Sequence, residues 1–185
     1  MSQPRPATRI PRDTDKPRRF VFVLLENFTL LSFASAVECL RIANRMSGTE
    51  SYSWHVIGEG GVEVGCSVGS VFKLDGDLEE LSRDDTLMIC GGINVQKHTT
   101  KKLLGWIRRE ARKGIPVAGL CTAAFTLAKA GLLDGKRATI HWENHDSFAE
   151  EFLEVELTKS VFVVDGNRLT TAGGTSSIDL MLKLL

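Results

Sequence analysis

The chain of 185 residues lacks an excess of charge of either sign, because 23 lysines and arginines balance 23 aspartates and glutamates. A domain that grips nucleic-acid phosphates normally carries a basic excess. The sequence also lacks an apolar run long enough to span a membrane and the apolar segment of a secretory signal. These absences argue against direct DNA binding by this segment, against a membrane partner and against secretion.

Cysteine is scarce and has no metal-binding spacing. Cys39, Cys66, Cys90 and Cys121 form no CxxC pair, which argues against a zinc site or a disulfide framework and indicates the reducing cytoplasm. No third ligand is spaced to join His141 and His145 in a metal site. We therefore expect neither a metal nor a cofactor.

The two ends of the sequence differ from its centre. Residues 1–18 are rich in proline and arginine without apolar periodicity, which predicts a disordered leader; the alternative is a basic arm that contacts a partner. Residues 19–185 suit one globular domain. Near the end, Ile178, Met181, Leu182 and Leu185 keep helical spacing to the last residue with no glycine stop. This pattern predicts a portion excised from a longer polypeptide.

Strands and helices alternate along residues 19–185. Apolar runs at 19–25, 85–92 and 115–120 are typical of buried parallel strands, and residues 52–58 alternate like a strand. Helical spacing marks residues 32–46, with Ser32 as the expected N-cap, residues 99–114 and the segment after Cys121. The glycine-rich residues 59–77 predict a loop with a short hairpin.

The last third of the sequence continues the alternation. Residues 136–142 predict a strand, residues 143–152 a helix, and residues 161–174 two strands joined by a Gly166-Asn167 turn, before a final helix from residue 175. The order predicts an α/β fold of three layers. Its centre is a doubly wound, mostly parallel sheet with helices on both faces, of the flavodoxin-like kind.

Ligands of such sheets bind beyond the carboxyl ends of the strands. Cys121 follows a strand and opens a helix, between Gly119 and Ala123, like the serine of the G-x-S-x-G nucleophile elbow. The helix dipole would lower the pKa of the thiol, and free backbone N–H groups of Thr122 and near Gly92 would bind an anion. We predict a crevice with the Cys121 sulfur exposed and facing His141. The alternative is that Cys121 is only a packed small residue.

Three longer stretches carry a resemblance to a known family. They are "FVFVLLENFTLLSFASAVECLRIAN", "AGLCTAAFTLAKAGLLDGKRATIHWE" and "TTAGGTSSIDLMLKLL". They resemble the ThiJ/PfpI group of the class I glutamine amidotransferase-like superfamily. The resemblance is closer still to the version that forms the amino-terminal half of AraC-family transcriptional regulators. It covers residues 19–185.

The resemblance implies a role for individual positions. The family's elbow cysteine matches Cys121, its histidine matches His141, and the glycine that lines its oxyanion site matches Gly92. The acidic residue that hydrogen-bonds the cysteine in the enzymes falls on Ser32 here. Thr122 stands where protease-like members carry a histidine. Because catalytic groups of this kind act as a unit, the missing acid predicts binding without turnover.

We therefore expect the effector-sensing domain of a bacterial AraC-family regulator, which binds a small nitrogenous or carboxylated metabolite. The resemblance implies a homodimer and a helix-turn-helix DNA-binding domain beyond residue 185, through which alone DNA would be bound. The expected ligand contacts are Asn27, Gly92, Ile93, Cys121, Thr122 and His141. Trp142 would hold a cationic group by cation–π attraction or pack in the core.

The alternative is a ThiJ/PfpI-type enzyme, such as a hydratase, a glyoxalase-like enzyme or an amidase. In that case Cys121 would be the nucleophile and His141 would assist it.

Overall fold

A six-stranded sheet of order β2-β1-β5-β6-β10-β9 forms the centre of the computed structural model, which describes residues 16–185. All neighbouring strands are parallel except the antiparallel edge pair β9–β10. The leader predicted for residues 1–18 lies outside the described residues except for its last three, and Arg18 already belongs to β1. The strands are β1 (Arg18–Leu24), β2 (Tyr52–Ile57), β5 (Thr86–Cys90), β6 (Val117–Leu120), β9 (Phe162–Asp165) and β10 (Arg168–Thr171).

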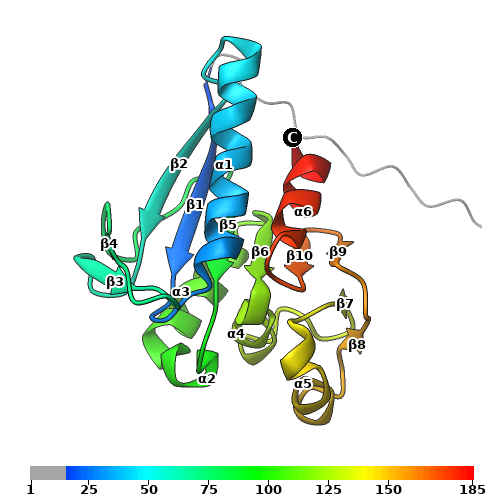
Figure 1. Cartoon of the computed structure of the whole chain (residues 1–185). Coiled ribbons are helices and arrows are strands. Elements are labelled where there is room, and N and C mark those ends of the chain that lie inside the picture. The colour runs from blue at the N-terminus through cyan, green and yellow to red at the C-terminus, as the bar shows by residue number, and fades with distance from the viewer. Residues whose placement is uncertain (1–15) are drawn as a thin grey trace, which may run out of the picture.

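Helices cover both faces of this sheet (Figure 1). Alternate residues of β1 enter two separate apolar clusters, Phe20 and Phe22 in one and Val21 and Val23 in the other, as the two-residue period of a strand requires. The first cluster is closed by α1 (Leu30–Ser47) and α6 (Ser176–Leu184), the second by α3 (Lys101–Ala111) and α4 (Ala124–Lys129). The predicted three-layer, doubly wound fold is confirmed.

Shorter elements complete the chain. They are the predicted hairpin of β3 (Glu63–Gly65) and β4 (Val71–Lys73), the helices α2 (Val95–His98) and α5 (His145–Glu151), and the 3-10 turns η1 (Cys121–Ala123) and η2 (Trp142–Asn144). A separate two-stranded sheet pairs β7 (Arg137–Ala138) with β8 (Glu156–Leu157).

The strand predicted for residues 136–142 is wrong beyond Ala138. The place beside β10 in the main sheet is taken by β9, and the start of this segment pairs with β8 instead. After Ala138, the Thr139 amide instead donates to the Thr170 hydroxyl at 2.9 Å. His141 therefore does not stand at the end of a strand of the main sheet.

The expected N-cap of the first helix is also wrong. The N-cap of α1 is Thr29, and Ser32 lies inside the first turn, where its hydroxyl accepts a hydrogen bond from the Gly174 amide at 2.8 Å. In α6 the buried apolar residues are Leu180 and Met181. The final helix predicted from residue 175 is confirmed. Of the four apolar residues at helical spacing, Met181 is buried, and the exposed ones are Ile178, Leu182 and Leu185.

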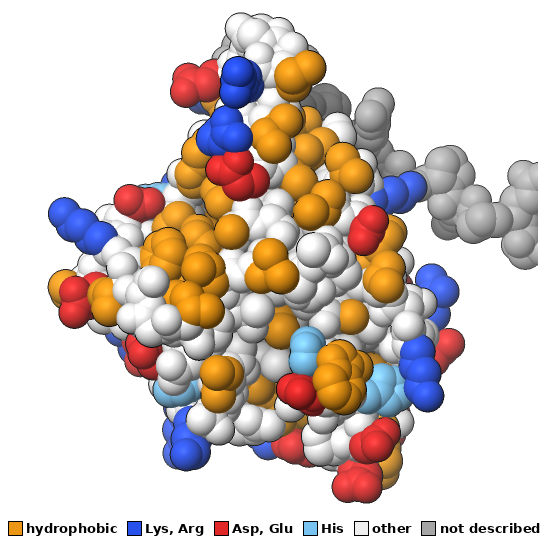
Figure 2. Space-filling model, in the orientation of Figure 1, with side chains coloured by type: hydrophobic (Ala, Val, Ile, Leu, Met, Phe, Trp, Pro, Cys, Tyr) orange, Lys and Arg blue, Asp and Glu red, His pale blue; other side chains and the backbone are white. Residues whose placement is uncertain are grey.

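Hydrophobic side chains gather on the surface over α1 and α6 (Figure 2). The large exposed ones form what we call the α1–α6 face: Leu31, Ile42 and Met46 of α1, with Ile178 and Leu182 of α6. Among residues 16–185, none of the helices is both long enough and apolar enough to cross a lipid bilayer.

A buried carboxylate links α3 to the loop before β5. The Glu110 side chain is fully buried and accepts hydrogen bonds from the Leu81 amide at 3.0 Å and from Arg109 Nε at 2.8 Å. It also forms an ion pair with Lys113 Nζ at 2.8 Å. Burial opposes ionisation of Glu110, but the hydrogen bonds from Lys113, Leu81 and Arg109 outweigh it and hold its pKa below the ordinary value.

Replacing this carboxylate should destabilise the fold in a pH-dependent way. We expect Glu110→Ala to lower the free energy of unfolding by about 2 kcal/mol at neutral pH, because Leu81 and Lys113 lose their acceptor. A group whose pKa is lower when folded stabilises above its unfolded pKa and loses that effect as the pH falls through the folded pKa. In urea titrations the gap between wild type and variant should therefore shrink below about pH 4. The control is Glu150→Ala, on the exposed side of α5. An equal loss of unfolding free energy in the control, or a difference between wild type and Glu110→Ala that does not depend on pH, would contradict the prediction.

Candidate functional site

Cys121 occupies the sharp turn that the sequence predicted. It follows β6 with a φ of 60°, in the left-handed region that few residues other than glycine adopt, and it opens η1 before α4. A Cβ on Gly119 would lie 2.9 Å from the Ala124 amide nitrogen. Only glycine fits at position 119 without displacing the following turn.

The sulfur of Cys121 is buried, and the predicted exposure is wrong. The residue is 3% exposed. Its Sγ lies 3.4 Å from the Thr29 hydroxyl, and a Cβ on Gly173 would come within 2.7 Å of Sγ. The loop after β10 and the segment before α1 therefore close over the sulfur from two sides.

The thiol is also not activated. Burial raises the pKa of Cys121 above its ordinary value, and hydrogen bonds with Thr29, the Thr122 amide and Ser32 offset only part of the rise. The prediction that the helix dipole would lower this pKa is wrong, because α4 spans six residues and desolvation of the sulfur dominates.

Ser32 lies beside the sulfur, at the position predicted for the missing acid. Its hydroxyl is fully buried, bonds to Gly174 and is within hydrogen-bonding reach of Cys121. Within residues 16–185 no carboxylate hydrogen-bonds to the sulfur. Glu26, which follows β1, instead accepts a hydrogen bond from the Gly65 amide at 3.1 Å. A serine hydroxyl carries no charge and replaces the carboxylate only as a hydrogen-bonding group.

His141 does not pair with Cys121. The half-buried imidazole precedes η2, and its Nδ1 lies 3.7 Å from a Glu143 carboxylate oxygen. No hydrogen bond joins His141 to Cys121 in the described part of the chain. The neighbouring Trp142 is 74% exposed, so the alternative in which it packs in the core is wrong.

The other predicted contacts lie together just after β1, β5 and β6, and hydrogen bonds link them to one another. Asn27, at a φ of 60°, accepts a hydrogen bond from the Ile93 amide at 3.0 Å, so that amide is not free for an anion as predicted. The Thr122 hydroxyl donates to the Gly92 carbonyl at 2.8 Å. A Cβ on Gly92 would clash with the Asn27 carbonyl oxygen, which makes glycine necessary. The Ile93 side chain is 54% exposed.

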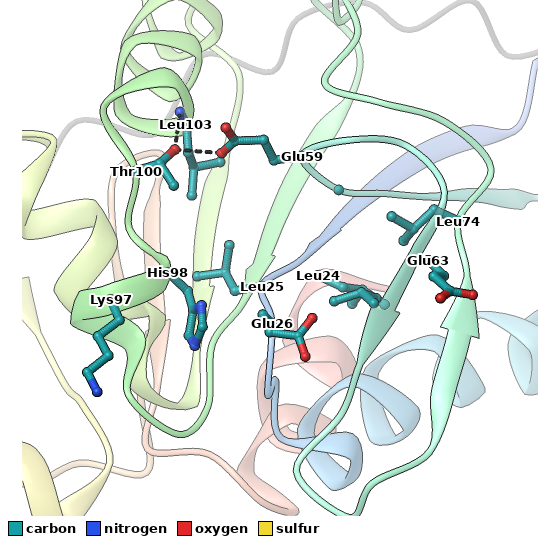
Figure 3. Close-up of a pocket in the computed structure, with 12 residues that line it drawn as sticks. Leu24, Leu25, Glu26, Glu59, Glu63, Leu74, Lys97, His98, Thr100 and Leu103 are labelled. Atoms are coloured by element: carbon teal, nitrogen blue, oxygen red, sulfur yellow. Dashed lines mark hydrogen bonds between the residues drawn. The ribbon is translucent and has the colours of Figure 1, made fainter.

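Two cavities lie elsewhere on this edge, and neither is lined by Cys121. One of about 280 Å³ adjoins Trp142 and His145, and the buried Nε2 of His145 has no hydrogen-bond partner. The other, of about 340 Å³, lies beyond β1 and β2 and is lined by Glu26, Glu59 and His98 among others (Figure 3).

Sequence reasoning missed this second cavity. The available signal was the position of Glu26 and Glu59, each within two residues of the carboxyl end of a strand. Among the described residues, no three histidine, cysteine, aspartate or glutamate side chains are grouped to hold a metal ion.

Comparison with known proteins extends these observations. The profile of the DJ-1/PfpI family matches residues 18–185. The HTH-type transcriptional regulator CdhR of Pseudomonas aeruginosa is 44% identical over 166 residues, which are 90% of this chain and 49% of CdhR. The chain thus spans about half the length of this relative. Isonitrile hydratase of Pseudomonas putida is 34% identical over 131 residues, 70% of this chain and 57% of the enzyme.

A solved structure has the same fold. The crystal structure of an AraC family transcriptional regulator from Pseudomonas putida superimposes with a TM-score of 0.78 at 29% identity, covering 91% of this chain and 90% of that one. The similar proteins thus include both regulators and an enzyme, and the residues around the sulfur must distinguish the two.

The buried thiol should be slow to alkylate. At about pH 8 we expect iodoacetamide to modify Cys121 at least about tenfold more slowly than free cysteine, because the thiolate is the reactive form. Peptide mass spectrometry would follow Cys121 beside the partly exposed Cys39. In urea both should react at the free rate, which controls for sequence effects. Rapid labelling of the folded protein near pH 6 would show an activated thiolate and contradict this structure of the site.

Proposed function

Because the chain belongs to the DJ-1/PfpI family, we propose that it is the effector-binding domain of an AraC-family transcriptional regulator. The observation that carries this proposal is the match to CdhR along nearly the whole domain, together with the serine at position 32. The domain binds a small nitrogenous or carboxylated metabolite and does not convert it. Such a regulator acts in the cytoplasm.

The alternative of a ThiJ/PfpI-type enzyme rests on the similarity to isonitrile hydratase. It requires Cys121 as the nucleophile with His141 assisting. A buried thiol of raised pKa, with a serine at its side and no contact to His141, lacks the groups that would form and use a thiolate. Each factor of ten in rate requires about 1.4 kcal/mol of barrier lowering, and no charged group at the sulfur supplies it. We therefore favour binding over turnover.

In the proposed regulator, residues 19–185 sense the effector, and a helix-turn-helix domain that follows residue 185 binds DNA. The balanced charge of this chain fits a domain that leaves phosphate contacts to another part of the protein. The proposed effector contacts remain Asn27, Gly92, Ile93, Cys121, Thr122 and His141, with Cys121 as a buried residue and not an exposed reactive group.

We also propose that the domain is a homodimer in which a second copy covers the α1–α6 face. The side chains of this face repeat at helical spacing on each helix, and Met46 and Leu182 are 81% and 68% exposed. Contiguous apolar surface of this kind marks interaction sites. A second copy places the same face opposite itself about a two-fold axis.

Charge on this face should dissociate the dimer. We expect Leu182→Lys to lower the mass measured by analytical ultracentrifugation toward that of the monomer, because two like charges would meet at the self-complementary contact. Leu153→Lys places the same charge on another exposed leucine, which is 82% exposed, and should leave the mass unchanged. A monomeric wild type, or equal masses for the two variants, would refute the interface.

The proposed function is tested on the full-length protein by a thermal-shift screen of small nitrogenous acids and amines. A ligand that binds the folded state raises the melting temperature, and the same ligand should change binding to promoter DNA. The affinity of Cys121→Ser for that ligand should stay within about tenfold of the wild-type affinity, since a thiol and a hydroxyl of similar size fill the same space. Conversion of the ligand by wild type but not by Cys121→Ser would favour the enzyme. A reading frame that stops at residue 185 would refute the regulator.

A further inference from the structure

The smaller cavity, of about 280 Å³, is built by four segments that meet beside α5. They are the segment after β7, the first turn of α5, the loop between β8 and β9, and the residue after β10, Ala172. The segment after β7 contributes Thr139, Ile140 and Trp142. None of the six proposed effector contacts is among the described residues that line it, so the cavity is separate from the Cys121 turn.

Hydrogen bonds between these segments hold the walls of the cavity in place. The Thr139 hydroxyl donates to the Ser160 carbonyl at 2.6 Å, and the Thr139 amide donates to the Thr170 hydroxyl at 2.9 Å. The Ala172 amide donates to the Val161 carbonyl at 2.9 Å. The cavity is therefore formed before a ligand arrives, as small-molecule sites usually are.

The lining offers an apolar wall and one exposed aromatic ring. Ile140 is 3% exposed and forms the wall together with Ala172. Trp142 is 74% exposed, and its ring centroid lies 5.8 Å from that of His141. An indole outside the core presents a flat surface on which another ring can stack. A cavity of about 150 Å³ already holds benzene, so this one has room for a single substituted six-membered ring.

One polar atom at the cavity has no partner. His145 opens α5 and lines the cavity, and its buried Nε2 forms no hydrogen bond with a described residue. The Nδ1 of the same ring lies 3.8 Å from Asp146 Oδ1, so a proton on Nδ1 faces that carboxylate. In this neutral tautomer Nε2 is a hydrogen-bond acceptor. A buried acceptor without a donor costs free energy, and a ligand that supplies the donor removes this cost.

The charges at the cavity balance. Asp146 and Lys159 line it with opposite signs, and both residues are exposed. Water and salt screen exposed charges of this kind, and their sum favours neither an anion nor a cation. The cavity therefore suits a neutral ligand.

We propose that this cavity binds a small neutral ring compound with one hydrogen-bond donor, of the phenol type. The ring lies against Trp142 and Ile140, and its hydroxyl donates to His145 Nε2. The inference goes beyond the proposed function and does not depend on it, because it adds a second site with a different class of ligand. The contact is a hydrogen bond, so the ligand is bound and not converted.

Two probes of nearly equal shape test the need for a donor on the full chain: phenol, and fluorobenzene, which has no hydroxyl. In NMR titrations we expect phenol to shift the amides of Ser160 and Ala172 and the Nε2 nitrogen of His145. Phenol should bind about fivefold more tightly than fluorobenzene, as the gain of one hydrogen bond to a buried acceptor predicts. Equal affinities, or no shift of these signals up to about 20 mM phenol, would overturn the proposal.

Matched variants test the residues. His145→Phe keeps a ring but removes the acceptor, and should lower the affinity for phenol to that for fluorobenzene, which stays unchanged. Trp142→Ala removes an exposed side chain, so it should fold as wild type, and should weaken both probes about fivefold. His98→Phe and Trp54→Ala make the same changes outside the cavity and are the controls.

Each variant has an outcome that contradicts the site. If His145→Phe binds phenol as tightly as His98→Phe does, the hydrogen bond to Nε2 is refuted. If Trp142→Ala and Trp54→Ala bind the two probes equally, the ring does not lie in this cavity. Neither outcome affects the proposed regulator, which fails through ligand turnover or a reading frame that stops at residue 185.

Discussion

The left-handed backbone at Cys121 is the constraint on which the site depends. A non-glycine residue at positive φ costs roughly 1–2 kcal/mol, so its surroundings must favour that conformation. The Thr171 hydroxyl accepts a hydrogen bond from the Cys121 amide at 3.3 Å, and glycine at position 119 leaves space for the following turn. The conformation directs the sulfur toward Thr29 and Ser32, where the loop at Gly173 closes over it. Burial of the thiol is therefore a consequence of the turn together with what packs against it.

The residue at position 32, which lies beside the sulfur, determines which chemistry is available at the Cys121 turn. A carboxyl group beside the sulfur can hold or move a proton, whereas the Ser32 hydroxyl can only donate or accept a hydrogen bond. Burial raises the pKa of the thiol, which opposes formation of the thiolate, the nucleophilic form. The same fold can therefore serve an enzyme in one relative and a regulator in another, because function depends on the groups at the site and not on the fold.

The segment from Glu26 to Thr29 connects three parts of the molecule. Glu26 lines the acidic cavity, Asn27 bonds to Gly65 and to Ile93, and Thr29 contacts the sulfur and caps α1. The segment therefore joins the wall of this cavity, the hairpin and the sulfur of Cys121 to the start of α1.

The sequence by itself determined the layered α/β fold, the hairpin, the Gly166-Asn167 turn, the elbow at Cys121 and the serine where an acid would stand. These features follow from local periodicity, from glycine positions and from a long matching motif. Only the tertiary structure decided that the sulfur is buried, that His141 does not contact it, and that β9 excludes residues 136–142 from the sheet. The solvation of Cys121 depends on Thr29 and Gly173, far away in sequence, and the cavity depends on Glu26, Glu59 and His98, which come from separate segments. Burial and pKa result from such distant contacts, which no local pattern encodes.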